Sequence, residues 1–89
     1  MKSYLFFISG RVQGVYYRAN VAQNALEAGF SGYVKNLEDG RVEATVTCEV
    51  SELEVFQNIL RRGSPSSEVT SIDIKEIDKY FSGTFEVQK

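Results

Sequence analysis

The chain has 89 residues, of which 43% are apolar and 25% are charged, and its formal net charge at pH 7 is −2. This composition predicts a single globular domain over residues 1–89 with a modest core, and it excludes a disordered chain. The negative charge disfavours proteins that wrap nucleic acid or lie on anionic membranes, so we expect neither as a partner.

The first apolar run, residues 4–8, is β-branched and aromatic and predicts a central strand that ends at Gly10. The run is far shorter than a membrane span and has no small-residue cleavage site behind it, so it is not a signal peptide. We therefore expect a soluble, cytoplasmic protein.

Residues 17–28 contain good helix formers and predict a helix. Ala22, Ala25 and Leu26 follow helical spacing, and Gly29 stands where a C-cap glycine belongs. Residues 30–36 then predict a strand with one face made of Phe30, Gly32 and Val34 and the other of Tyr33 and Lys35.

The pair Asp39-Gly40 is a strong hairpin signal. The run that follows alternates, which predicts a strand with one buried face. We expect inward side chains at Val42, Ala44, Val46, Cys48 and Val50, and outward side chains at Arg41, Glu43, Thr45, Thr47 and Glu49.

A second helix is predicted to begin at a capping box made of Ser51 and Glu54. Its buried stripe comprises Leu53, Phe56, Ile59 and Leu60, and Arg61-Arg62-Gly63 ends it with positive charge and a glycine. After a loop at residues 64–67, strands are expected around residues 72–77 and 84–87. The order is that of an α+β, ferredoxin-like split βαβ (βαββαβ) sandwich, an antiparallel sheet with two helices on one face.

The stretch "GRVQGVYYR" lies where the first strand gives way to the first helix. Glycines let a backbone approach a ligand closely, and a helix N-terminus offers unpaired N–H groups, so the stretch is suited to hold an anion such as phosphate. The expected N–H donors are Gln13, Gly14, Val15, Tyr16 and Tyr17, and the guanidinium of Arg18 suits two phosphate oxygens. A plain turn beside a solvated arginine explains the stretch equally well, and the glycine spacing is not that of a nucleotide-binding loop.

Asn36 ends the second predicted strand, where its amide could project beside the glycine loop. A turn residue that starts the hairpin is at least as good an interpretation.

Two segments together resemble the signatures of the acylphosphatase family. "GRVQGVYYR" is similar to G-x-V-Q-G-V-x-[FY]-R, and "GYVKNLEDGRV" is similar to G-[FWY]-V-x-N-x-x-D-G-x-V. The resemblance extends over the whole chain in length and in element order. Tyr33 stands where tryptophan or phenylalanine is commoner, and Tyr16-Tyr17 where phenylalanine often occurs, departures that concern packing.

The resemblance implies hydrolysis of the carboxyl-phosphate anhydride of acyl phosphates, with Arg18 and the loop N–H groups holding the phosphoryl group and Asn36 holding the attacking water. It implies no metal or other cofactor. The residues agree with this chemistry, because a carboxylate leaves without a general acid and the chain contains no histidine. The absence of histidine also excludes a Ser-His-Asp triad and a phosphohistidine. Cys48, the single cysteine, has no arginine six residues on, which excludes a cysteine-phosphatase loop, and we expect it in the core. We also expect a monomer.

Two other functions remain open. An RNA-recognition module shares this element order, but residues 41–46 carry no aromatic side chain for stacking bases. A catalytically silent domain that binds a phosphorylated or carboxylated metabolite would use the same loop, although it would not need Asn36 to hold water.

Overall fold

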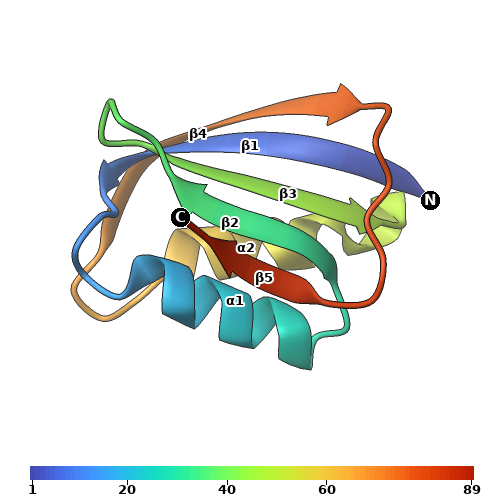
Figure 1. Ribbon diagram of the computed structural model, residues 1–89, viewed down its shortest axis with the longest axis horizontal. Coiled ribbons are helices and arrows are strands. Elements are labelled where there is room, and N and C mark those ends of the chain that lie inside the picture. The colour runs from blue at the N-terminus through green and yellow to red at the C-terminus, as the bar shows by residue number, and fades with distance from the viewer.

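The computed structural model describes all residues from Met1 to Lys89. The elements in chain order are β1 (Lys2–Arg11), α1 (Tyr17–Glu27), β2 (Ser31–Asn36), β3 (Val42–Cys48), the 3-10 turn η1 (Val50–Glu52), α2 (Leu53–Arg62), β4 (Glu68–Ile77) and β5 (Phe85–Gln88). The strands form one sheet in the order β4-β1-β3-β2-β5, and both helices lie on the same face of it (Figure 1). The predicted ferredoxin-like sandwich is confirmed.

The sheet is mixed, because its last strand runs parallel to its neighbour. The pairs β1–β3, β1–β4 and β2–β3 are antiparallel, as predicted, whereas β5 pairs with β2 in parallel. After β4 the chain passes along one end of the sheet and enters β5 in the direction of β2 (Figure 1). Parallel neighbours end at the same edge, so Gln88 pairs with Lys35, next to Asn36.

The core lies between the sheet and the two helices. On β3 the predicted inward residues from Val42 to Cys48 are at most 1% exposed. The ring of Phe56 on α2 lies at the centre of an aromatic cluster, with ring centroids 5.2 Å from Phe6, 5.3 Å from Phe30 and 5.7 Å from Phe85. This one side chain therefore packs against β1, the residue that precedes β2, and β5.

The predicted capping box of the second helix is wrong. The capping box is formed by Glu49 and Glu52, with the Glu49 backbone N–H donating to the Glu52 carboxylate over 3.1 Å. It opens η1, which runs directly into α2, so Ser51 and Glu54 form no box. Because the chain leaves the strand at Cys48, Val50 lies in η1 and is 62% exposed, contrary to its predicted inward position.

One other side chain differs from its expected burial, and one apolar side chain of α1 is exposed. Leu26 follows helical spacing but is 51% exposed, because the buried face of α1 is formed by Tyr17, Val21, Ala22 and Ala25. Thr45, expected outward, is 1% exposed, and its hydroxyl accepts a hydrogen bond from the Tyr33 backbone N–H over 3.2 Å. This hydrogen bond gives the buried hydroxyl the polar partner that it needs inside the protein.

Neither helix is long and apolar enough to cross a membrane.

Candidate active site

The loop between β1 and α1 has a backbone suited to an anion. Gly14 has φ +71°, and Tyr16, the N-cap of α1, has φ +62°. Left-handed residues interleaved with ordinary ones turn successive N–H groups toward one side, as in anion-binding nests. No side chain caps the helix, and its first turn contains no acidic residue. The first-turn N–H groups and the positive end of the helix dipole are therefore available to a negatively charged ligand.

Tyr16 is held in its unusual conformation from the helix side. Its carbonyl oxygen accepts hydrogen bonds from the backbone N–H of Asn20 over 3.1 Å and from the Asn20 side-chain amide over 2.9 Å. A left-handed conformation is uncommon for a bulky residue and persists where the surrounding structure determines it.

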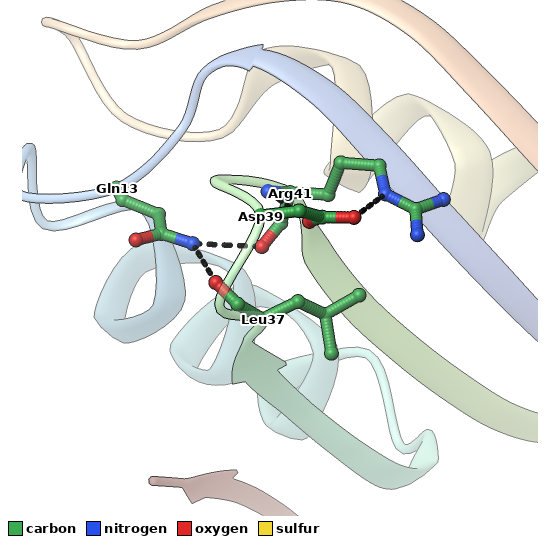
Figure 2. Close-up of polar contacts among 4 residues, drawn as sticks. All are labelled: Gln13, Leu37, Asp39 and Arg41. Carbon is green, nitrogen blue, oxygen red and sulfur yellow. Dashed lines mark hydrogen bonds and ion pairs between the residues drawn. The ribbon is translucent and has the colours of Figure 1, made fainter.

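Gln13 joins the loop to the β2–β3 hairpin. Its side-chain nitrogen donates to the carbonyl oxygens of Leu37 and Arg41, both over 2.8 Å (Figure 2). Within the hairpin, Asp39 accepts hydrogen bonds from the Arg41 backbone N–H over 3.0 Å and from its guanidinium over 2.8 Å, and these bonds lower the pKa of the Asp39 carboxyl. The two segments that resemble the family signatures are thus bound to each other directly.

The loop is braced on its other side by the segment that follows α2. The buried hydroxyl of Ser64 donates to the Val15 carbonyl oxygen over 2.6 Å. Tyr17 is 1% exposed, and its hydroxyl donates to the Leu60 carbonyl oxygen over 2.7 Å. Burial raises the pKa of Tyr17 far above its usual range, so its side chain is a neutral structural group.

Arg18 is held by the end of β5. One terminal nitrogen of its guanidinium, Nη1, donates to the Gln88 carbonyl oxygen over 2.7 Å. None of the four ion pairs in the structure includes Arg18, so no carboxylate neutralises it. The guanidinium is thus oriented by one bond and keeps other N–H groups for a ligand.

Asn36 is the last residue of β2, as predicted. Its side-chain oxygen Oδ1 is buried and has no hydrogen-bond partner within the protein. A buried acceptor without a partner costs about 1–3 kcal/mol, so such an atom in a native structure calls for an explanation.

Arg18 and Asn36 line the same cavity, which has a volume of about 370 Å³. The residues that line it are Val12, Gly14, Tyr16, Tyr17, Arg18, Ala19, Asn36 and Val87. Of the predicted loop residues, Gln13 and Val15 do not line the cavity and brace the loop instead, so the anion-binding role of their N–H groups stays a prediction. Sequence analysis missed Ser64 and Val87, which lie far from either signature in the chain and carry no local signal.

A larger hollow of about 580 Å³ lies over the other side of β2 and β5. Its lining includes Tyr33, Lys35, Lys79 and Glu86 but neither Arg18 nor Asn36 nor any residue of the glycine loop. We therefore place the candidate site in the smaller cavity.

The fold and this cavity define an α+β protein with a candidate anion site at a helix N-terminus. A sequence model of the family described as acylphosphatase matches residues 4–87. An acylphosphatase from Methylococcus capsulatus is 42% identical over 77 residues, which are 86% of this chain and 84% of that protein. One from Methanocella arvoryzae is 40% identical over 88 residues, 99% of this chain and all of that one.

Among solved structures, the acylphosphatase from Bacillus subtilis superposes with a TM-score of 0.88 and 35% identity, and all of both chains is covered. The chain belongs to the acylphosphatase family. The resemblance predicted from the two signatures is confirmed.

Proposed function

We propose that Arg18 and Asn36 catalyse the hydrolysis of acyl phosphates, the reaction of the acylphosphatase family, in the cavity that both residues line. The observation that carries the proposal is the unpartnered, buried Oδ1 of Asn36 in the same cavity as an arginine that no carboxylate neutralises.

The phosphoryl group binds at the start of α1. The N–H groups of the loop and the first helical turn donate to its oxygens, and the free nitrogens of the Arg18 guanidinium add two charge-assisted hydrogen bonds. The bond from Nη1 to the Gln88 carbonyl limits the rotation of the fork, so the positive charge is already in place when the transition state forms.

Asn36 Oδ1 accepts a hydrogen bond from the attacking water. This bond satisfies the acceptor and turns a lone pair of the water toward phosphorus, opposite the leaving carboxylate. The amide itself exchanges no proton.

The reaction balances without a general acid. The water oxygen forms a new bond to phosphorus while the bond from phosphorus to the acyl oxygen breaks, and its electron pair leaves with the carboxylate. A phosphate oxygen of the substrate accepts the proton of the water. A carboxylate is a weak base and leaves unprotonated, so a site without histidine is sufficient.

The test is hydrolysis of benzoyl phosphate by the wild type and by Asn36→Ala, in buffer with EDTA and no added metal. We expect rapid turnover by the wild type and a loss of roughly 10²-fold in kcat for Asn36→Ala, the usual effect of removing one positioned contact to the transition state. Asn24→Ala, on the exposed side of α1, is the matched control and should keep the wild-type rate. An unchanged kcat in Asn36→Ala would remove the water-positioning role, and activity lost with EDTA would contradict the metal-independent route.

A silent phosphate-binding domain is the alternative. It would bind inorganic phosphate with the same loop and hydrolyse neither benzoyl nor acetyl phosphate.

A monomer in the cytoplasm stays a prediction from the sequence. Light scattering of the purified protein with and without phosphate checks the monomer, because a mass near 10.0 kDa is expected in both cases.

A further inference from the structure

The lining of the cavity combines polar and apolar residues. Arg18 and Asn36 supply polar side chains that suit a phosphoryl group. The rest of the lining is largely apolar and includes Val12, Tyr16, Ala19 and Val87. The volume of about 370 Å³ exceeds what a phosphoryl group needs and falls within the range of small-molecule sites, roughly 300–1,000 Å³.

Tyr16 contributes to this lining without a packing role of its own. Its side chain is 82% exposed, the largest exposed fraction among the large apolar and aromatic residues of the chain. Its hydroxyl makes no hydrogen bond, whereas the Tyr17 hydroxyl next to it in sequence is bonded to Leu60. The left-handed backbone at φ +62°, secured by Asn20, presents the ring outside the core at the cavity. A strained residue of this kind at a cavity is grounds for a functional hypothesis.

Val87 contributes to the lining from a different element. It lies on β5, paired with the fully buried Val34 of β2, yet it is 48% exposed. Tyr16 and Val87, far apart in the chain, both expose apolar surface in the cavity that contains the proposed phosphate site. Covering this surface with the rest of a ligand is favourable, because it removes apolar area from water.

We propose that Tyr16 and Val87 form the subsite for the acyl group, and that the enzyme prefers acyl phosphates whose acyl group is uncharged, apolar and flat, above all aromatic. This inference rests on the proposed function. The phosphoryl end is the same in every acyl phosphate, so discrimination must come from the surface that the acyl group contacts. The face or edge of the Tyr16 ring suits an aromatic acyl group, and Val87 provides an aliphatic contact.

The charges in the cavity support the same class of substrate. Arg18 is the only charged residue in the lining, and the phosphoryl group engages it. A free carboxylate elsewhere on the acyl group would find no cationic partner in the lining and would lose hydration against Tyr16 and Val87.

The test compares kcat/KM for benzoyl phosphate with kcat/KM for acetyl phosphate in the wild type and in variants. Tyr16→Asn removes the ring and keeps a residue that tolerates a left-handed backbone. We expect it to lower the benzoyl-to-acetyl ratio about tenfold, within the range that a hydrophobic pocket discriminates. Tyr16→Phe should keep the ratio, because it retains the ring. Val87→Thr should lower it several-fold.

Tyr80→Ser is the matched control, because Tyr80 is 67% exposed and lines the other hollow, and its ratio should equal that of the wild type. Inhibition by inorganic phosphate, measured on each variant, reports the cradle alone and should stay within about twofold of the wild type, since each substitution changes a side chain and keeps the backbone N–H groups that hold the ion. An unchanged ratio in Tyr16→Asn, or equal losses for both substrates with weaker phosphate inhibition, would overturn the subsite. Wild-type protein that turns over neither substrate would overturn the proposed function as well, an outcome distinct from turnover without preference.

Discussion

The side-chain nitrogen of Gln13 lies 2.8 Å from the carbonyl oxygen of Arg41, and this contact joins the glycine loop to the hairpin that follows Asn36. The same nitrogen donates to Leu37, the residue directly after Asn36, over 2.8 Å. Gln13 itself directly precedes Gly14. The Gln13 amide therefore holds the proposed phosphate-binding loop against the segment that follows Asn36, the proposed water-holding residue, across 28 residues of chain.

We predict that Gln13→Ala impairs both stability and catalysis. Each carbonyl keeps one other hydrogen bond, from Leu37 to Arg41 and from Gly40 to Leu37, so the unfolding free energy should fall by only about 1–2 kcal/mol. The kcat should fall about tenfold or more, because small displacements of positioned groups are costly to rate. Urea denaturation and benzoyl phosphate hydrolysis measure the two effects. Gln23→Ala, which removes an exposed bond to Glu27, is the control; an unaltered kcat in Gln13→Ala would make the bridge purely structural.

Arg18 should not be replaceable by lysine. Arg18→Ala and Arg18→Lys should each lose roughly 10²–10³-fold in kcat/KM, because a point charge cannot both bond to Gln88 and present two parallel donors to a phosphoryl group. Steady-state kinetics with benzoyl phosphate measures the loss. Arg61→Ala removes an arginine whose only side-chain hydrogen bonds, to Asn58 and Gln57, lie at the surface, and it should behave as the wild type. Near-normal activity of Arg18→Lys would show that charge alone suffices.

Gly63→Ala should destabilise the protein through a steric contact beside the site. A Cβ atom at Gly63 would lie 2.5 Å from the ring of Tyr17 and 2.5 Å from the Ser67 hydroxyl, and φ is +48°. We expect the unfolding free energy to fall by about 2–4 kcal/mol, since overpacking adds to the backbone strain. In Gly29→Ala, where φ is +85° and no atom lies within 4 Å, only the strain of about 1–2 kcal/mol applies. Equal losses in the two variants, compared by urea denaturation, would exclude the contact with Tyr17.

The stability of the protein should fall at alkaline pH through Tyr33. Burial, together with a hydrogen bond of 2.5 Å to Glu43 and its charge, raises the pKa of Tyr33 from 10.0 to about 12. The unfolded chain loses this proton first, so the stabilisation is complete below pH 10 and is lost as the pH rises toward 12. Buried Tyr17, whose pKa is also raised, adds to the same trend. Urea denaturation at pH 8 and pH 11 should show a smaller fall for Tyr33→Phe than for the wild type, and falls of equal size would contradict the assignment.

Several features of the fold could be predicted because neighbouring residues determine them. The hairpin at Asp39-Gly40 depends on a glycine that adopts φ +94°. The buried stripe of α2 from Leu53 to Leu60 follows from helical periodicity, and the buried face of β3 follows from strict alternation. The capping box was harder to predict, because two overlapping pairs of residues three positions apart lie in this segment. The structure uses Glu49 and Glu52, whereas the sequence predicts Ser51 and Glu54.

The sequence by itself determined the element order, the family and the residues of the two signatures, because each of these is written in short-range spacing. Only the tertiary structure decided that β5 pairs in parallel with β2, which places Gln88 against Arg18 and Val87 in the cavity. It alone also decided that the Gln13 side chain faces the hairpin. These contacts join residues separated by 24 to 70 positions, and they depend on where the packing of α1 and the sheet brings distant backbone groups together, which no local pattern encodes.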